Sequence, residues 1–252
     1  MKRLANLAQS GIAIYKYKKY RRQFTVRPNI QELKLMSEWF YFLTLPAVKV
    51  IYDIGAAEGV FSSGCSKIAN VQQIVALEPN PDMAPALNKL THRASHCTYV
   101  PVAAGRAMGS HLFHVTADGH ASSCLTALPF LNQIFLGRNV KKSISIQMQT
   151  LDEIRSSANL PYADLIKIDT QGYEREVISG ASNTLSHASF CIVECCYEKL
   201  YEDAPLISDI FSIFSVLGWA IVGTGPSLKA VSGRPVFTDL IFASKRGLQA
   251  MK

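Results

Sequence analysis

The sequence contains no uncharged apolar run of eighteen residues, the minimum expected of a membrane-spanning helix. Its longest apolar stretch, residues 210–223, is shorter and includes two serines. The N-terminus carries early basic residues but lacks the apolar core and small-residue cleavage site of a secretion signal. We therefore expect a cytoplasmic protein without a transmembrane segment.

Cysteine is sparse and has no metal-binding or disulfide pattern. None of the six cysteines forms a CxxC pair. Cys195 and Cys196 are adjacent on an expected strand, so their side chains point to opposite faces. Free thiols in a reducing compartment are the simplest interpretation, and a zinc site is not expected.

Charge is also scarce outside the N-terminus. Charged residues make up 18% of the chain, and the net charge is +7. Residues 1–47 hold nine lysines and arginines against two glutamates, whereas the remainder is balanced at seventeen of each sign. The basic character therefore belongs to an N-terminal arm, and the main domain gives no indication of nucleic-acid binding.

Within this arm, residues 15–22 interleave tyrosines with lysines and arginines. Such a segment could contact an anionic glycan, an acidic membrane surface or nucleic acid. We favour a solvated helix face whose tyrosines pack on the domain. Residues 30–45 have apolar side chains at helical spacing, which predicts a helix covering the sheet or a partner in a homodimer.

From residue 48 onward, apolar strand patterns alternate with helical ones. This alternation predicts an α/β fold with a doubly wound, mostly parallel sheet covered by helices on both faces. We divide the chain into a helical N-terminal extension (1–47) and a single domain (48–246) with a less regular insertion at about 105–149. The two final strands have no helix between them, so we expect an antiparallel pair at the C-terminal edge of the sheet. Expected strands are 48–54, 74–77, 97–104, 111–115, 144–149, 164–169, 190–196, 219–223 and 236–243, and expected helices are 59–69, 81–90, 173–185 and 207–217.

The turn after the first strand is where an open α/β sheet binds a nucleotide-like ligand. A dinucleotide fingerprint would need glycines at 53, 55 and 58, but the chain has Asp53, Gly55 and Glu58. The two carboxylates would repel a pyrophosphate, which disfavours NAD or FAD. A phosphate-binding loop starting at Gly59 is excluded because Cys65 replaces its lysine. S-adenosylmethionine has no phosphate and carries an ammonium and a sulfonium, so it suits this acidic turn.

The second strand ends in Glu78, followed by Pro79 and Asn80. A carboxylate at this position can accept both hydroxyls of a ribose. We therefore assign a second group of residues to the cofactor site, together with the first turn. The expected cofactor-binding residues are Asp53, Gly55, Ala56, Glu58, Gly59, Glu78, Pro79, Asn80, Ala103 and Asp169.

Taken together, the motifs resemble those of the FkbM family of S-adenosylmethionine-dependent methyltransferases over residues 48–243. They are Asp53-Ile54-Gly55-Ala56, Glu78-Pro79-Asn80, Thr150-Leu151-Asp152, Leu165-Ile166-Lys167-Ile168-Asp169-x-x-Gly172-x-Glu174, Gly180-Ala181 and Ile192-Val193-Glu194. The resemblance implies a class I methyltransferase fold of Rossmann-like architecture. It also implies methyl transfer to a hydroxyl oxygen of a sugar or small molecule, with S-adenosylhomocysteine as the product. A catalytically inactive binding protein and, with less support, an NAD-dependent oxidoreductase are the alternatives.

One departure concerns the family's usual Asp-x-Glu-Gly, which here reads Asp169-Thr170-Gln171-Gly172. Gln171 keeps hydrogen-bonding capacity but carries no charge. Methyl transfer needs an acceptor oxygen aligned with the S–CH3 bond, and an alcohol acceptor benefits from a general base. Asp169 is the first candidate for that base or for orienting the substrate, with a helix cap as the structural alternative.

Glu194, at the end of the fifth strand of the domain, is the second catalytic candidate. His120 and Ser122 lie in a glycine-containing segment that could act as a lid over substrate. Asp169, Glu174 and Glu194 are oxygen ligands of the type that magnesium prefers, yet we predict no required metal. Glu174 is expected to face solvent or to pair with a nearby lysine or arginine.

Overall fold

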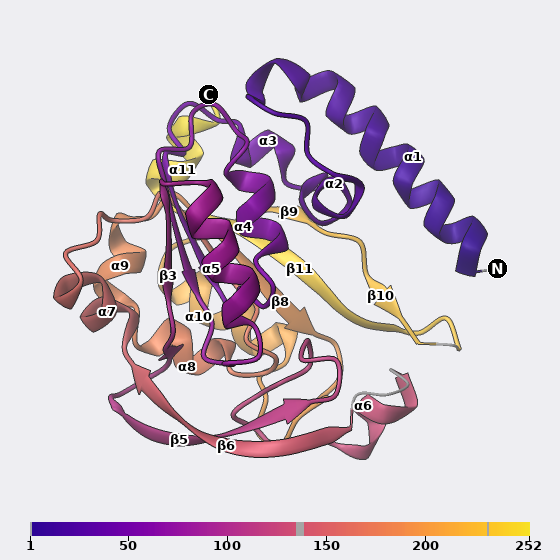
Figure 1. Cartoon of the computed structure of the whole chain (residues 1–252), viewed down its shortest axis with the longest axis vertical. Coiled ribbons are helices and arrows are strands. Elements are labelled where there is room, and N and C mark those ends of the chain that lie inside the picture. Colours follow the sequence, from indigo (N-terminus) through magenta and orange to yellow (C-terminus); the bar gives the residue numbers. More distant parts are fainter. Residues whose placement is uncertain (1, 135–138, 231) are drawn as a thin grey trace.

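The chain forms a central sheet with helices on both faces and a smaller sheet at one end (Figure 1). The computed structural model describes residues 2–134, 139–230 and 232–252. The strand order of the central sheet is β10-β11-β8-β7-β1-β2-β3, and β9 also pairs with β11. The strands are β1 (Val50–Ile54), β2 (Gln73–Leu77), β3 (Cys97–Val100), β7 (Leu165–Ile168), β8 (Phe190–Cys196), β9 (Ala220–Thr224), β10 (Leu228–Lys229) and β11 (Pro235–Ala243).

Strands β1, β2, β3, β7 and β8 run parallel, whereas β11 is antiparallel to both β8 and β9. The predicted mostly parallel sheet with an antiparallel C-terminal pair is therefore confirmed. Within this pair β11 is the inner strand, and β9 and β10 lie at the edge.

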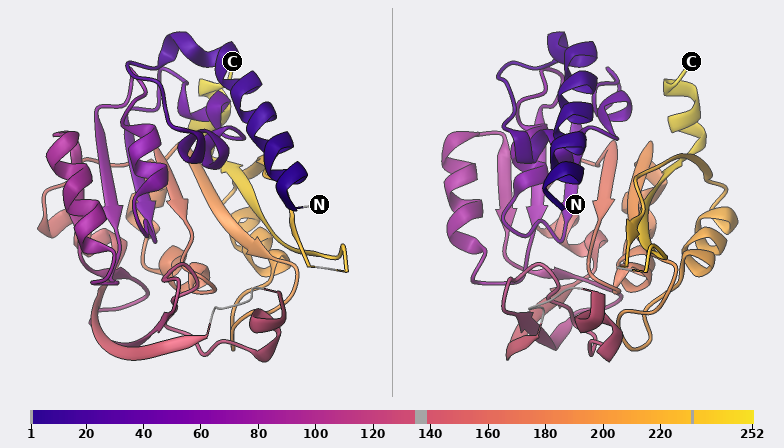
Figure 2. Two further views of the ribbon diagram at one scale, coloured as in Figure 1. Left: turned by 45° about the vertical axis from the view of Figure 1, so that its right-hand side comes forward. Right: turned by 90° about the vertical axis from the view of Figure 1, so that its right-hand side faces the viewer.

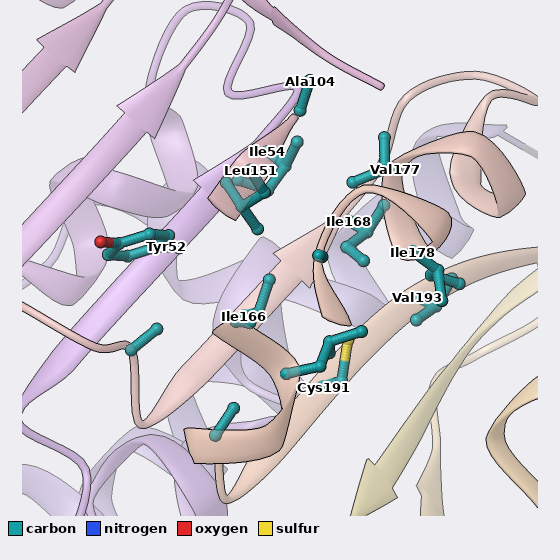
Figure 3. Close-up of a cluster of buried hydrophobic side chains, with 14 of the residues drawn as sticks. Tyr52, Ile54, Ala104, Leu151, Ile166, Ile168, Val177, Ile178, Cys191 and Val193 are labelled. Atoms are coloured by element: carbon teal, nitrogen blue, oxygen red, sulfur yellow. The ribbon is translucent and has the colours of Figure 1, made fainter. Parts of the chain in front are cut away.

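The side chains of each central strand alternate between two buried clusters, one on either face. Tyr52 and Ile54 of β1 point to the cluster that Figure 3 shows, beneath α7 and α8, whereas Ile51 belongs to the opposite cluster. The first face is covered by α7 (Leu151–Ser157), α8 (Glu174–Ser179), α9 (Ser182–His187) and α10 (Ile207–Val216), and the second by α2 (Ile30–Met36), α3 (Phe40–Leu43), α4 (Val60–Cys65) and α5 (Ala84–Arg93).

The N-terminal segment is helical and its first helix lies outermost on the molecule (Figure 2). Helix α1 (Lys2–Tyr20) leads through η1 (Arg21–Gln23) to α2 and α3. Tyr17 is buried against the domain as expected, but Tyr15 is 76% exposed. The predicted helix over residues 30–45 is divided into α2 and α3, and its apolar side chains cover the sheet.

Polar contacts as well as apolar packing hold helix α2 against α4 and the residues that follow it. Asn29 and Glu32 form a capping box at its N-terminus. The buried Glu32 carboxylate also accepts hydrogen bonds from Lys67 Nζ at 2.6 Å and Ser63 Oγ at 2.6 Å. These contacts fix α2 at the carboxyl-end side of the sheet, where it forms part of the site described below.

The insertion builds the second sheet, in which β5 (Gly109–Thr116) and β6 (Val140–Gln149) are antiparallel and β4 (Ala103–Ala104) pairs with β6. The expected strands at 111–115 and 144–149 are thus confirmed within longer ones. Helix α6 (Pro129–Ile134) precedes β6. The curved β5–β6 ribbon lies across the carboxyl ends of the parallel strands (Figures 1 and 2).

Two predicted helix boundaries were wrong. The helix expected at 59–69 is confined to α4, since the chain after Cys65 continues in turns. The helix expected to open at Pro81 begins at Ala84 as α5, because Asn80 first makes a turn in which its Oδ1 accepts from Asp82 N.

Two predicted elements are each divided in two. The strand expected at 97–104 breaks at Pro101, which cannot donate a ladder hydrogen bond, and its end becomes β4 of the second sheet. The helix expected at 173–185 is interrupted at Gly180 and Ala181, which separate α8 from α9. In the described ranges, no helix has both the length and the apolar character needed to cross a bilayer. The remaining described helix is α11 (Lys245–Ala250).

Candidate functional site

Two adjacent cavities lie at the carboxyl ends of the parallel strands. The first, about 330 Å³, extends from the first turn and Glu78 to Glu194 and Asp239, and we call it the main cavity because it reaches across the sheet. The second, about 430 Å³, lies between the first turn and α2, and we call it the side cavity. Leu35 of α2 lines both cavities, so the N-terminal extension contributes to the site directly.

The first turn brings three strands together. Gly55 has φ +81°, and a Cβ at this position would lie 1.9 Å from the carbonyl oxygen of Asp169. Gly55 N and Ala56 N donate to the carbonyl of Leu77 at 2.9 and 3.0 Å. Only glycine fits a left-handed residue in such close contact with backbone. Gly55 lines both cavities, as expected of a cofactor-binding turn.

The other residues of this turn have different positions. Ala56 and Glu58 line the side cavity. Gly59 has φ +74° and is the N-cap of α4. It lines neither cavity, so its assignment to the cofactor site stays a prediction.

Asp53 is buried at the end of β1 and lines the side cavity. Its Oδ2 accepts from Ser62 Oγ at 2.6 Å, whereas its buried Oδ1 has no hydrogen-bond partner in the described structure. Burial raises the pKa of Asp53, and the nearby Lys167 and Ser62 only partly offset this effect. A buried acceptor without a partner is costly unless a ligand supplies the donor.

Glu78 lies in the wall of the main cavity at the end of β2, with Pro79 beside it. Its two carboxylate oxygens accept from Ala57 N and Asn80 N, both at 2.9 Å. These bonds fix the carboxylate and leave it lone pairs for further donors. Burial raises the pKa of Glu78 to about 7. Ala103 also lines the cavity, whereas Asn80 is buried behind Glu78 and lines neither cavity.

Charged side chains form a row across one face of the sheet. In the strand register Asp53 of β1 pairs with Lys167 of β7, and Asp239 of β11 pairs with Glu194 of β8. Lys167 pairs with Ile192, which lies two residues before Glu194 and therefore points to the same face. The row consequently runs from the side cavity to the far end of the main cavity.

Lys167 is the buried cation at the centre of this row. Its Nζ donates to Asp169 Oδ2 at 2.8 Å. Burial alone would lower the pKa of Lys167, but Asp169, Asp53 and Asp239 together raise it. Burial disfavours the charged form of Asp169 too, yet Lys167 holds the pKa of Asp169 below its usual value. Asp169 is therefore a carboxylate at neutral pH.

Gln171 connects the two predicted catalytic carboxyls. Its Nε2 donates to Asp169 Oδ1 at 2.9 Å and to Glu194 Oε2 at 3.1 Å. The hydroxyl of Tyr201 lies 3.1 Å from Gln171 Oε1, which fixes the orientation of the amide. Gln171 has φ +56°, a conformation that is rare for a residue with a side chain and is often found at functional sites.

The two carboxyls differ in protonation. Burial raises the pKa of Glu194 well above its usual value, and Asp169, Glu174 and Asp239 raise it further. Asp169 does not cap the following helix, because the N-cap of α8 is Tyr173. The helix-cap alternative was therefore wrong: the Asp169 carboxylate accepts from Lys167 and Gln171 and lies in the wall of the main cavity. Its catalytic role stays a prediction.

The expectation that Glu174 faces solvent or pairs with a basic residue was wrong. Glu174 is buried, and its Oε1 accepts from Thr170 N at 2.9 Å and Gly172 N at 3.1 Å. This carboxyl therefore shapes the backbone around Gln171. In the described residues, no three His, Cys, Asp or Glu side chains are grouped so as to hold a metal ion.

His120 is exposed at the rim shared by the two cavities, and Ser122 lines the main cavity. Both belong to the loop that follows β5. The structure thus places both residues at the cavities, but a lid function of the segment and a catalytic role for His120 stay predictions.

Sequence reasoning missed Lys167, Asp239 and Tyr201 as parts of the site. Lys167 and Asp239 each interrupt an apolar strand, LIKI and TDLIFA, and that interruption was the available signal. Lys167 and Asp239 lie on β7 and β11, the two strands that flank β8, and charges withdrawn from solvent in a sheet must be compensated. The register places both of them in the row of opposite charges described above. Tyr201 follows β8 in an irregular segment and carried no such signal.

Comparisons with known proteins agree with this geometry. The methyltransferase FkbM domain matches residues 53–219, from the first turn to the start of β9. The chain belongs to the FkbM methyltransferase family. The structure of this FkbM-family protein is similar to a crystal structure of the methyltransferase FkbM from Methylobacillus flagellatus KT, with a TM-score of 0.50 and 15% identity over 90% of this chain and 58% of that one. This likeness confirms the class I methyltransferase fold.

Two curated relatives of this FkbM-family protein have a stated activity. The hexuronic acid methyltransferase AglP of Haloferax volcanii is 29% identical over 58% of this chain and 55% of that protein. The 2-O-methyltransferase NoeI of Sinorhizobium fredii is 29% identical over 67% of this chain and 73% of that protein. The chain thus matches only about half the length of the first relative.

Proposed function

We propose that this protein transfers a methyl group from S-adenosylmethionine to a hydroxyl oxygen of a sugar. The observation that carries the proposal is the ionised Asp169, held by Lys167 and Gln171 in the wall of a cavity that also contains the turn at Gly55 and the Glu78 carboxylate. Membership of the FkbM family and the sugar-directed or O-directed names of the two relatives support it.

The residues present fit the proposed cofactor. Asp53 Oδ1, buried without a partner, can accept from an ammonium group, and Glu78 can accept from ribose hydroxyls. Ile54 and Leu77 give the main cavity an apolar floor next to Glu78. When bound, the cofactor supplies an electrophilic methyl group on a sulfonium.

The chain's own residues would position and deprotonate the acceptor. The acceptor hydroxyl would gain the methyl group that the cofactor supplies and lose its proton, and Asp169 would accept that proton. Lys167 and Gln171 keep the Asp169 carboxylate in place and ionised, so that it can accept this proton. Positioning supplies much of the rate, because the reaction needs a collinear arrangement of oxygen, carbon and sulfur.

Two alternatives have less support. Loss of catalysis through Gln171 is disfavoured because its amide holds Asp169 and Glu194 rather than removing either. A nicotinamide cofactor is disfavoured because Asp53 and Glu58 lie where a pyrophosphate would bind.

The first test is calorimetric titration of the protein with S-adenosylhomocysteine, repeated on Asp53→Asn and Glu78→Gln. We expect micromolar binding that each substitution weakens several-fold, about 1 kcal/mol or more. Glu202→Gln, which removes an exposed carboxylate outside both cavities, is the matched control and should bind like the wild type. A folded wild-type protein that does not bind the compound would contradict the proposal.

Two further predictions accompany this proposal: the basic arm contacts an anionic surface, and the protein forms a homodimer. Lys18, Lys19, Arg21 and Arg22 are exposed near the end of α1, which supports contact with an anionic surface. Salt-sensitive retention on an anionic matrix, lost when the four are replaced by glutamine, would support this contact. A sedimentation measurement would decide the oligomeric state. A cytoplasmic location also stays a prediction.

A further inference from the structure

Among the described charged side chains that line the two cavities, carboxyls outnumber lysines. The main cavity has one lysine, Lys167, and the side cavity adds Lys34 of α2 next to the first turn. No arginine lines either cavity within the described residues. The carboxyls that line one or both cavities are Asp53, Glu58, Glu78, Asp169, Glu194 and Asp239.

These carboxyls divide between the two substrates. Asp53 and Glu58 lie at the first turn, and Glu78 lies at the end of β2, so all three would face a cofactor bound as proposed. Glu194 and Asp239 lie on β8 and β11, at the opposite end of the main cavity. The acceptor must therefore enter beside Glu194 and Asp239, with Asp169 between it and the cofactor.

Lys167, the one lysine that the described residues place in the wall of the main cavity, is already engaged. Lys167 Nζ is bonded to Asp169 at 2.8 Å and also faces Asp53 and Asp239. Arg106 and Arg175, which line neither of the two cavities, both form ion pairs with Glu176. His120 at the rim faces Asp169.

Among the described residues of the main cavity, an acceptor with its own carboxylate would find no lysine or arginine left to pair with it, and the Asp169 and Asp239 carboxyls lie in the same cavity. Proteins recognise carboxylates with arginine or lysine donors, commonly through a bidentate arginine. In this cavity burial and mutual repulsion already raise the pKa of Glu194, and burial raises the pKa of Asp239 to about 6. Sugar hydroxyls, in contrast, can donate hydrogen bonds to these carboxyls or accept from their protonated forms.

We propose that the acceptor is an uncharged sugar and that the row of carboxyls excludes hexuronates. This inference rests on the proposed function and narrows its substrate class. It sets this protein apart from its relative AglP, whose name gives hexuronic acid as the substrate. Asp239, which lines the acceptor end of the cavity, is the residue we expect to contribute most to the discrimination.

The test compares matched sugars that differ only at C6, where one carries a hydroxymethyl group and the other a carboxylate. Methyl β-D-glucopyranoside is paired with methyl β-D-glucopyranosiduronate, and the galactose pair is tested likewise, with kcat/KM measured by formation of S-adenosylhomocysteine. We expect at least a tenfold preference for the uncharged member of a pair. Asp239→Asn should narrow this ratio several-fold, mainly by improving the uronate, whereas Glu202→Gln should leave it unchanged.

The outcomes separate this inference from the function on which it rests. Equal or better transfer to the uronate would overturn the inference and leave sugar methylation intact. No transfer to any member, while S-adenosylhomocysteine still binds, would overturn the sugar acceptor and this inference with it. The wild-type ratio decides the matter even where Asp239→Asn does not fold.

Discussion

Gln171 gives the candidate site one negative charge fewer than the glutamate usual at this position in the family would. Its amide donates to both Asp169 and Glu194, and Tyr201 fixes its far end. The usual glutamate of the family would place a third carboxyl between these two. The chain keeps the left-handed backbone that points this side chain at its partners while removing its charge.

Replacing this amide tests the arrangement. In Gln171→Glu the added negative charge should raise the pKa of Asp169, because like charges disfavour ionisation. The acidic limb of the kcat/KM–pH profile should then move to higher pH. Gln171→Met removes the donors without adding charge and is the control, in which we expect lower activity and a smaller shift. A Gln171→Glu profile identical to the wild type would refute this role.

Gly55 offers a second test at the same scale. A methyl group there would lie 1.9 Å from the carbonyl oxygen of Asp169, in a backbone conformation unfavourable to alanine. Gly55→Ala should therefore weaken binding of S-adenosylhomocysteine by more than tenfold and lower the melting temperature. Gly11→Ala, at a helical site with nothing within 4 Å, should leave binding unchanged and stabilise α1 by up to about 1 kcal/mol. Calorimetry measures the binding and thermal unfolding measures the melting temperature of both variants. If Gly55→Ala binds S-adenosylhomocysteine normally, the turn can move enough to accommodate a methyl group and the prediction is wrong.

At the scale of elements, α2 connects the N-terminal extension to the site. Glu32 satisfies its own helix N-terminus and binds Lys67 and Ser63 of the neighbouring segment, while Leu35, on the same short helix, lines both cavities. The extension is thus part of the cavity wall and not only an appendage of the domain.

Glu32→Gln removes one partner of this buried ion pair. Breaking such a pair costs about 3 kcal/mol or more when the remaining charge stays buried, although Lys67 is partly exposed and can recover some hydration. We expect a loss of about 2 kcal/mol in the free energy of unfolding, together with weaker binding of S-adenosylhomocysteine. Glu38→Gln breaks the more exposed pair with Lys16 and should cost less than about 1 kcal/mol. If urea denaturation gives the two variants the same loss in the free energy of unfolding, the buried Glu32 contacts stabilise the protein no more than the exposed pair does.

The elements that sequence reasoning placed correctly are those whose signal is local. The strands β1, β2 and β7 are mainly apolar runs, and the first turn, Glu78 and Asp169 respectively lie at their ends. The break between α8 and α9 has a distant cause, since a Cβ on Gly180 would lie 1.9 Å from the carbonyl oxygen of Gly105. No pattern within the helix encodes that contact.

The same distinction applies to the site. Gly55, Glu78 and Asp169 could be located because each ends a strand that the sequence reveals. The Gln171 bridge and the pairing of Asp239 with Glu194 depend on which strands are neighbours, and on an irregular segment that positions Tyr201. Such contacts arise from the folded topology and are not carried by spacing alone.

For the whole molecule, the buried carboxyls link stability to pH. Burial raises the pKa of Glu78 and Glu174 from 4.5 to about 7, and that of Asp239 from 3.8 to about 6. Above the unfolded values the folded protein therefore binds more protons than the unfolded chain, so stability must fall as pH rises through this window. Asp169 has a lowered pKa and acts in the opposite direction only at more acidic pH.

We therefore expect the free energy of unfolding of the ligand-free protein to decrease by a few kcal/mol between pH 5 and pH 8. Urea denaturation at several pH values measures this decrease. Glu174→Gln keeps the acceptor for Thr170 N and Gly172 N but cannot ionise, so it should flatten the profile. Glu153→Gln, at the capping box of α7, changes a carboxyl outside both cavities and should keep the slope. If the free energy of unfolding instead increases between pH 5 and pH 8, burial does not raise the pKa values of these carboxyls and the prediction is wrong.

The acid-rich row across the sheet also bears on turnover. With its ammonium, carboxylate and sulfonium, S-adenosylmethionine carries one net positive charge, and the transfer step removes the sulfonium charge. If Asp53, Glu78 and Asp169 hold the cofactor as proposed, their carboxyls would attract it less once it has lost that charge. The side chains that favour binding of the cofactor would then also favour release of the spent product.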